Sequence, residues 1–422
     1  MNQDQLFLLL KKEWNIFSRH VIEQSNRNYN WLFNQPTTYF LPSYFQLGSY
    51  YKTNIHYIVI SLCKRISKKL WKLFVWPYFI KNAFRLIEKD YFKTLNWNND
   101  LELRNTKVIF FNHLQLLAKK QPTVIADASI SDFLNIIGRS LLTYFNYIKG
   151  DIDIYRDHKK VQNKQCALLY DQLKPDLFER NDKFILLFFL AARANWIDSF
   201  ENEAAQFLQG FPTEINEIMA SSDLASFVDP LLGIFHTRMI IKFFNTGPKH
   251  ILYELDNSGE VYFDLLLVEE LLKAGHRITL VAKQAPCLND ITLTELQEIM
   301  DSPLLAWSIP YRNLNLLDFI HNGSSMPGKS LANVSNNYKQ AYEKTDLIIL
   351  KGQGNFQTMP IGYRNNKKFN PYFYKKPILI MMGVKSNLIH YSLKQIFKEN
   401  LPRLQSLFIY FFDPTNFNTY PR

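Results

Sequence analysis

The chain has 422 residues, of which 47% are hydrophobic and 21% charged, so it can bury a large core and is not an intrinsically disordered protein. Its formal net charge is +11, with most of the excess in residues 1–100, which suits either an anionic partner or a solvated helical surface. The three cysteines, at positions 63, 166 and 287, are too widely spaced for a disulfide framework or a zinc motif and favour a reducing, cytoplasmic setting.

Residues 1–100 read as a divergent basic helical extension. Within it, residues 59–87 interleave lysines with tryptophan, phenylalanine and leucine. This segment either touches a membrane surface or a nucleic acid, or packs its aromatic face on the rest of the protein. We expect no nucleic-acid partner, because Pro77 interrupts the segment and no nucleic-acid-binding motif accompanies it. No secretory signal is visible, and the longest apolar runs are too short to span a bilayer.

Residues 101–245 read as a helical domain. Helical spacing is strong over 153–173, and residues 184–200 form a nearly all-apolar segment, which is typical of a buried helix. Asn195 and Asp198 lie at the end of that segment and need polar partners if they are buried. Two interpretations stay open: they line an active site, or they cap the helix and bond neighbouring helices.

From residue 246 strands and helices alternate, which predicts an α/β domain over 246–422. The predicted fold class is therefore a three-layer α/β/α, Rossmann-like sheet in the C-terminal half, with an N-terminal all-helical domain. The strands expected are 251–253, 277–282, 346–350 and 377–382, the last of them the last core strand. The helices expected are 261–274, 293–300 and 333–342, and residues 314–321 lead to a polar loop over 322–329.

Residues 251–290 read as a βαβ unit, in which both turns lie at the carboxyl edge of a parallel sheet. Asp256, Asn257 and Asp290 occupy these turns and can converge on a hard cation such as Mg²⁺ or Mn²⁺. The backbone amides of Ser258, Gly259 and Glu260 open the helix, where a phosphate is favourably held. Alternatively, the Asp-Asn pair is an ordinary turn or helix cap.

Lys351 follows an apolar strand and precedes Gly352 and Gly354. It can project its ammonium group over a phosphate, or it can be a solvated lysine in a strand-to-helix turn. The dinucleotide pattern GxGxxG and the Walker pattern are both absent, so a nucleotide cofactor has no support.

Seven phrases follow one another in the chain: DIYRDHKKVQN (153–163), AARANWID (191–198), LDNSGE (255–260), AKQAPCLND (282–290), NGSSMPG (322–328), DLIILKGQGNFQTM (346–359) and PILIMMGVKSN (377–387). Together and in this order they resemble the metal-dependent damage-control phosphatase family, formerly known as domain of unknown function 89, which shares its fold with the pantothenate-kinase-associated phosphatase domain. The KGQGNF phrase is similar to that of the smaller prokaryotic-type branches of the family.

This resemblance implies a metal-dependent hydrolysis of phosphate monoesters of sugars or damaged phosphometabolites, with Mn²⁺, Mg²⁺, Co²⁺ or Ni²⁺ as cofactor. It implies that Asp256, Asn257 and Asp290 bind the metal, with Asp256 either a pure ligand or the attacking group. The remaining implied site residues surround the phosphate or line the site: Lys351, Asn355, Lys283, Asn195, Asp198 and the amides of 258–260.

Two positions depart from the family pattern. Lys385 is followed by Ser386 where the family usually has a Lys-Cys pair, and Met382-Gly383 stands where it usually has Leu-Lys. These departures bear on the substrate more than on the chemistry.

Two functions stay open as alternatives to a phosphatase. One is a protein carboxyl methyltransferase activity, although the chain has no glycine-rich loop suited to S-adenosylmethionine. The other is a non-catalytic protein that binds an anionic membrane surface through residues 59–87. We expect a small phosphorylated metabolite as the partner. The sequence does not determine the oligomeric state.

Overall fold

The computed structural model describes most of the chain between residues 153 and 413 and a few positions before residue 121. The basic segment 59–87, and with it the proposed surface-binding face, lies outside the described residues. The larger described ranges are 155–198, 201–220, 232–324, 334–357, 361–364, 368–370, 376–385 and 406–413.

A seven-stranded sheet in the order β2-β10-β9-β6-β3-β4-β5 forms the centre of the described part. Five neighbouring strands are parallel, and β10 is antiparallel to β9 and parallel to β2. The strands are β2 (Leu232–Phe235), β3 (His250–Glu254), β4 (Arg277–Ala282), β5 (Leu317–His321), β6 (Leu347–Lys351), β9 (Ile378–Gly383) and β10 (Leu407–Phe412). A second, three-stranded sheet consists of β1 (Tyr39–Phe40), β7 (Ile361–Arg364) and β8 (Lys368–Asn370).

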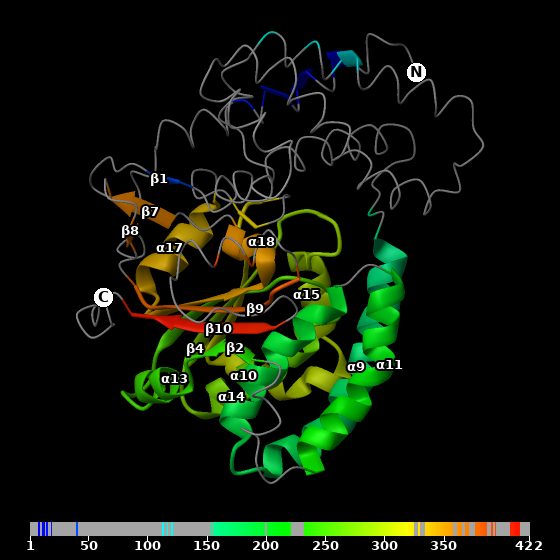
Figure 1. Ribbon diagram of the computed structural model, residues 1–422, viewed down its shortest axis with the longest axis vertical. Helices are drawn as coiled ribbons and strands as arrows, with labels where there is room; N and C mark the ends of the chain where they lie inside the picture. The colour runs from blue at the N-terminus through cyan, green and yellow to red at the C-terminus, as the bar shows by residue number, and fades with distance from the viewer. Residues whose placement is uncertain are drawn as a thin grey trace.

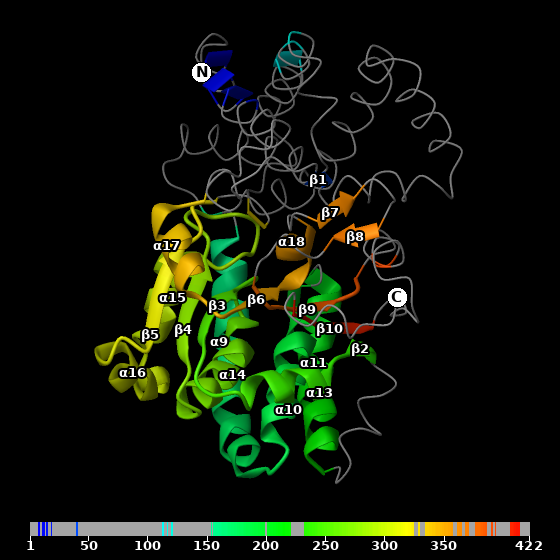
Figure 2. The same cartoon turned by 90° about the vertical axis from the view of Figure 1, so that its left-hand side faces the viewer.

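Helices cover both faces of the large sheet. In Figure 1, α17 and α18 lie on one side of the sheet, and α10, α13 and α14 lie on the other. Figure 2 shows α18 at the end of the strands opposite to α16, because α18 follows the carboxyl end of β6 and α16 precedes the amino end of β5. The α-helices are α9 (Arg156–Glu179), α10 (Lys183–Arg193), α11 (Glu201–Ala220), α13 (Thr237–Phe244), α14 (Val261–Lys273), α15 (Leu293–Met300), α16 (Ile309–Asn313), α17 (Asn336–Lys344) and α18 (Gly352–Gln357), and the 3₁₀ turns are η3 (Ala194–Asp198) and η5 (Pro303–Ser308).

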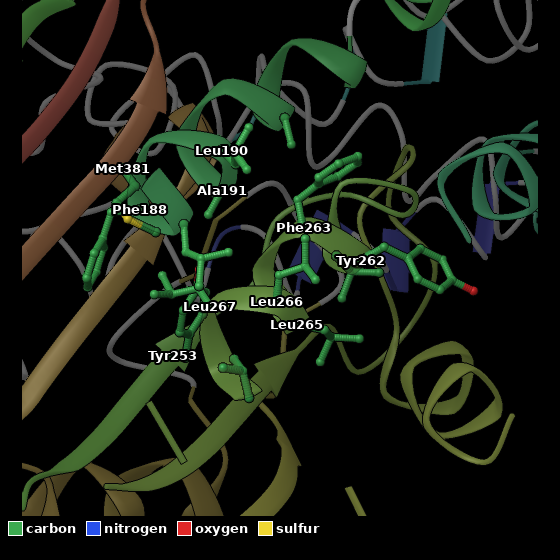
Figure 3. Packing of buried hydrophobic residues seen from close by; sticks show 14 of the residues in the cluster. Phe188, Leu190, Ala191, Tyr253, Tyr262, Phe263, Leu265, Leu266, Leu267 and Met381 are labelled. Carbon is green, nitrogen blue, oxygen red and sulfur yellow. The ribbon is translucent and has the colours of Figure 1, made fainter. Parts of the chain in front are cut away.

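The main core lies between α10, α14 and the sheet. Figure 3 shows Phe188 of α10 near Met381 of β9, and Leu265, Leu266 and Leu267 of α14 in the same cluster of buried side chains. The central strands β6 and β9 are buried along their whole length, as expected for strands covered on both faces. Because α10 and α14 are buried in one cluster, the apolar segment before residue 200 is part of the core of the sheet.

The predicted α/β/α fold class is confirmed, and several element boundaries coincide with the prediction. β4 and the helix Leu293–Met300 begin and end at the predicted residues. The helix expected over 184–200 ends earlier, at Arg193, and continues as the 3₁₀ turn η3. The domain divisions at 100 and 245 stay predictions.

The prediction that 377–382 is the last core strand is wrong, because β10 follows β9 and pairs with it along six residues. The sequence also did not predict β2, which lies before residue 246, where the predicted α/β domain begins. Both strands join the same edge of the sheet. Within the described residues no helix is both long and apolar enough to cross a bilayer.

Candidate active site at the carboxyl edge of the sheet

The turns after β3 and β4 are joined by backbone hydrogen bonds. The amide of Ile291 donates to the carbonyl of Asp256 at 2.9 Å, and the amide of Ser258 donates to the carbonyl of Asn289 at 2.9 Å. Asn257 and Asp290 face each other as an isolated antiparallel bridge. The structure therefore brings together the two turns, as the βαβ reading expected, with the side chains of Asp256, Asn257 and Asp290 all buried.

The carboxylate of Asp256 is held from three sides. Its Oδ2 accepts hydrogen bonds from Nδ2 of Asn195 and from Nδ2 of Asn257, both at 2.9 Å. On another side stands the backbone of Gly352, where a Cβ atom would lie only 1.7 Å from Oδ2. Since Gly352 also has a φ of +75°, this position needs glycine for two independent reasons.

Asn195 connects the end of the α10 segment to the sheet. Besides Asp256, its Nδ2 donates to Oε2 of Glu260 at 2.9 Å, while its Oδ1 accepts from the amide of Gly383 at 3.1 Å. All the hydrogen bonds fix one orientation of the amide group. The structure thus places Asn195 in contact with Asp256, and its role as a residue that lines an active site stays a prediction.

Lys351 does not project from the edge of the sheet. Its side chain is fully buried, and its Nζ lies 2.8 Å from Oδ1 of Asp264 and 3.7 Å from Oε1 of Glu260. It also donates to the carbonyl of Ala191. In this structure the ammonium group of Lys351 is turned towards the helices, where the buried carboxylates of Asp264 and Glu260 lie, and its expected role at the phosphate stays a prediction.

Burial and neighbouring charges together set the pKa values of Lys351 and Asp264. Burial by itself would lower the pKa of Lys351, but the carboxylates of Asp264 and Glu260 reverse that effect and raise the pKa above its usual value. Burial raises the pKa of Asp264 to about 7, although the ammonium group of Lys351 opposes that rise. Oδ1 of Asp264 also accepts from the hydroxyl of Tyr253 at 2.7 Å.

Lys283 lies at the same edge as the two turns. Its Nζ is 3.2 Å from Oδ2 of Asp290 and donates to the carbonyl of Gly328. The neighbouring Lys329 is fully buried and pairs with Glu254, the last residue of β3. Lys283 therefore joins the candidate metal ligands to the loop that contains residues 328–329.

Two of the three expected phosphate-binding amides are used inside the protein. The amide of Ser258 donates to Asn289, and the amide of Gly259 donates to Oδ1 of Asn163 at 2.6 Å. In this structure the turn at Asn289 and helix α9 occupy these two donors, and the phosphate-binding role of residues 258–260 stays a prediction.

Asn355 and Asp198 complete the list of expected site residues. Asn355 is buried, and its Nδ2 donates to the carbonyls of Leu255, at 3.1 Å, and Lys351, at 2.9 Å. These contacts tie α18 to the turn that contains Asp256. Asp198 ends η3, and its side chain lies outside the described part of the structure.

The sequence analysis gave no role to α9, to the side chain of Glu260, which precedes α14, or to Asp264 in the first turn of α14. Asn163 binds the amide of Gly259, and Gln162 donates to the carbonyl of Ile197, so one face of α9 holds both the glycine turn and η3. The adjacent polar residues Gln162 and Asn163, inside the phrase DIYRDHKKVQN, were a usable signal for this role of α9. The carboxylates of Glu260 and Asp264, at the start of a helix whose first half is mainly apolar, were a second signal.

The donor set suits a hard divalent cation. Asp256, Asn257 and Asp290 offer only oxygen ligands, and the buried hydroxyl of Ser258 has no hydrogen-bond partner among the described residues. Across the described ranges no group of three or more His, Cys, Asp or Glu side chains could hold a metal ion. A metal at this edge would therefore depend on the amide oxygen of Asn257 as well as on the two carboxylates.

Comparison with known proteins gives a consistent set of relatives. A damage-control phosphatase from Pyrococcus horikoshii is 34% identical over 113 residues, which are 26% of this chain and 35% of that protein. A damage-control phosphatase from Arabidopsis thaliana is 25% identical over 225 residues, 49% of this chain and 56% of that protein. The matched region thus spans about a third of the archaeal relative and about half of the plant relative.

The fold also has a solved counterpart. The crystal structure of a DUF89 family protein from Pyrococcus horikoshii superposes with a TM-score of 0.52 at 19% identity and covers 78% of this chain and 95% of that one. The family model of the damage-control phosphatase ARMT1-like domain matches residues 76–396, most of the chain. The chain therefore belongs to the damage-control phosphatase ARMT1-like family.

Proposed function

We propose that the protein is a metal-dependent phosphatase that hydrolyses phosphate monoesters of small, damaged or sugar-like phosphometabolites. The observation that carries the proposal is the meeting of Asp256, Asn257 and Asp290 on two hydrogen-bonded turns at the carboxyl edge of the sheet. Ligands of open α/β sheets bind outside this edge. The family membership of the chain supports the same reaction class.

In this proposal Asp256, Asn257 and Asp290 hold one divalent cation, with Mn²⁺, Mg²⁺, Co²⁺ and Ni²⁺ as candidates. When bound, the cation supplies Lewis-acid polarisation of a phosphoryl oxygen. Asn195 keeps the carboxylate of Asp256 in one orientation through its hydrogen bond to Oδ2. Lys283 supplies a positive charge 3.2 Å from Asp290, which suits an anionic substrate.

The setting proposed is the cytoplasm. The described cysteines, Cys166 and Cys287, are both free and buried, which suits a reducing compartment. Three matching relatives are damage-control phosphatases by name, which favours a phosphatase over the two alternative functions. The carboxyl methyltransferase and the surface-binding protein gain no supporting observation from the described residues.

The test uses the full chain, a generic aryl phosphate and each metal in turn. Asp256→Ala should lower metal-dependent hydrolysis at least ~100-fold, because it removes a ligand and a fixed negative charge from the reacting centre. It should also abolish the rise in thermal unfolding midpoint that Mn²⁺ causes in the unchanged protein, since ligand binding to the native state stabilises it.

Asp318→Ala is the matched control. Asp318 lies in β5 of the same sheet, but it is exposed, and it accepts a hydrogen bond from the amide of its neighbour Phe319. It should keep both the hydrolysis rate and the Mn²⁺ response. Full activity of the Asp256→Ala protein would refute the site, and the absence of hydrolysis in the unchanged protein across a panel of phosphorylated metabolites would refute the function.

A further inference from the structure

We infer that Lys351 is a positioning residue: it acts as the internal counter-ion of Asp264 and Glu260 and holds Asn195 against Asp256, and it does not bind the phosphate. This inference rests on the proposed function for its catalytic consequence, but its structural part stands on contacts alone. It concerns a lysine that the sequence pattern places next to the substrate.

The first argument is the position of the ammonium group. Lys351 is the last residue of β6, and all five residues of that strand are buried. Its Nζ lies 2.8 Å from Asp264 and 3.7 Å from Glu260, and the side chains of all three residues are fully buried. A cation that is desolvated in this way needs the carboxylates beside it, because burying an unpaired charge is very costly.

The second argument is the hydrogen bond to the helix that precedes Asn195. Lys351 donates to the carbonyl of Ala191 at 2.5 Å, two residues before the end of α10. The last carbonyls of a helix have no partner within the helix, and a cation there also complements the helix dipole. Lys351 thereby fixes the point at which α10 gives way to η3, the turn that carries Asn195.

The third argument is the continuous chain of polar contacts to the candidate metal ligand. Glu260 faces Lys351 with Oε1 and accepts from Asn195 with Oε2 at 2.9 Å. Asn195 in turn donates to Oδ2 of Asp256 at 2.9 Å. Lys351 therefore acts on Asp256 through Glu260 and Asn195, while its own donors are directed at Asp264 and Ala191.

A double-variant cycle separates this role from phosphate binding. Lys351→Met should lower the thermal unfolding midpoint by about 10 °C or more, since it leaves Asp264 as a buried carboxylate without its cation. Adding Asp264→Asn removes that charge and should restore most of the midpoint. Asp264→Asn alone should also lower the unfolding midpoint, because Lys351 then keeps only the more distant Glu260 as a carboxylate partner.

Two further readouts on the double variant address the site. The Mn²⁺-induced rise in unfolding midpoint should return, and the affinity for inorganic phosphate, measured by calorimetry with Mn²⁺ present, should stay within about threefold of the unchanged protein. A lysine that touches phosphate would instead cost at least about tenfold in that affinity, which the second substitution could not recover. Lys242→Met, on the exposed surface of α13, is the control and should change none of these values.

A restored midpoint with unchanged phosphate affinity supports the inference. An unrestored midpoint, or a tenfold loss of phosphate affinity in the double variant, overturns it. Failure of the unchanged protein to hydrolyse any phosphate ester would refute the proposed function instead, and the unfolding midpoints of the cycle would still decide whether Lys351 is the counter-ion.

Discussion

The two edges of the central sheet differ in the contacts of their buried polar side chains. At the carboxyl edge several of these side chains bond to one another, as Asn195 does to Asp256 and Lys351 to Asp264. At the amino edge the buried hydroxyl of Thr345 bonds the backbone instead, donating to the carbonyl of His250. Polar groups that satisfy the backbone stabilise the fold, whereas a connected side-chain network fixes the orientation of particular atoms. This difference agrees with the proposed position of the active site at the carboxyl edge.

The largest effect is expected from a pair of glycines, one at each edge of the sheet. Gly352 and Gly247 both have positive φ values, +75° and +103°, but a Cβ at Gly352 would meet Asp256 at 1.7 Å and one at Gly247 would meet nothing within 4 Å. Gly352→Ala should lower phosphatase activity at least ~100-fold, because the carboxylate of Asp256 must move. Steady-state hydrolysis of an aryl phosphate measures this.

Gly247→Ala carries the same kind of backbone strain without the contact. It should cost ~1–2 kcal/mol in the free energy of unfolding and leave the activity nearly unchanged. Equal activity losses in the two variants would mean that strain alone, and not the approach to Asp256, explains the effect at Gly352.

Asn195 tests the network itself. Asn195→Ala should lower kcat by roughly 10–100-fold, the usual cost of removing a group that orients a metal ligand. Asn195→Asp should be worse than alanine, since it places a third carboxylate against Asp256 and Glu260. Comparison of kcat and of half-saturating Mn²⁺ for both variants checks the order, and an aspartate variant better than alanine would contradict it.

The support from α9 should have a smaller effect. Asn163→Ala removes the acceptor for the buried amide of Gly259 and should destabilise the protein by ~1–3 kcal/mol in denaturant unfolding. Asn337→Ala, at an exposed position of α17, is the control and should stay within ~0.5 kcal/mol. A stability loss for Asn163→Ala no larger than that of the control would show that the amide finds another partner.

The smallest effect is expected at the amino edge and depends on pH. Burial lowers the pKa of His276 below 6.5, and its Nδ1 accepts from the amide of Lys249 at 3.0 Å, so the folded state favours the neutral ring. The unfolded chain then binds the proton more readily, and stability falls as the pH drops through 6.5. The loss should be less than ~1.4 kcal/mol per pH unit.

His276→Asn keeps an acceptor near the position of Nδ1 but cannot titrate. Unfolding of this variant between pH 7.5 and 5.5 should depend less on pH than that of the unchanged protein. Part of the dependence should remain, because burial also lowers the pKa of His250 at the same edge. An unchanged pH dependence would exclude His276 as its source.

The sequence predicted the meeting of Asp256 and Asp290 because two local rules suffice. A βαβ crossover makes the strands parallel neighbours, and parallel neighbours end at the same edge. β3 and β4 do pair in this way, over five residues each. The boundaries of β4 and α15 were also predictable, since a glycine precedes one and a capping box, Thr292 with Glu295, begins the other.

The direction of Lys351 was not predictable by the same means. In a strand with one buried face, alternation tells which side a residue faces, but every residue of β6 is buried. The choice between phosphate and core then depends on Asp264, which is distant in sequence and belongs to another helix. The partners of Asn195 are equally long-range, so its burial could be foreseen but its contact with Asp256 could not.

The placement of β10 has a consequence for the order in which the protein forms. Among the described strands β2 pairs only with β10, although nearly all of the sheet lies between them in the chain. During synthesis, β2 leaves the ribosome early, but it cannot pair with β10 until residues 407–412 have been made. The unit β3-α14-β4 needs no such wait, since its contacts are local. We therefore expect the site turns to assemble before the β2 edge, which would be the late and exposed part of the nascent protein.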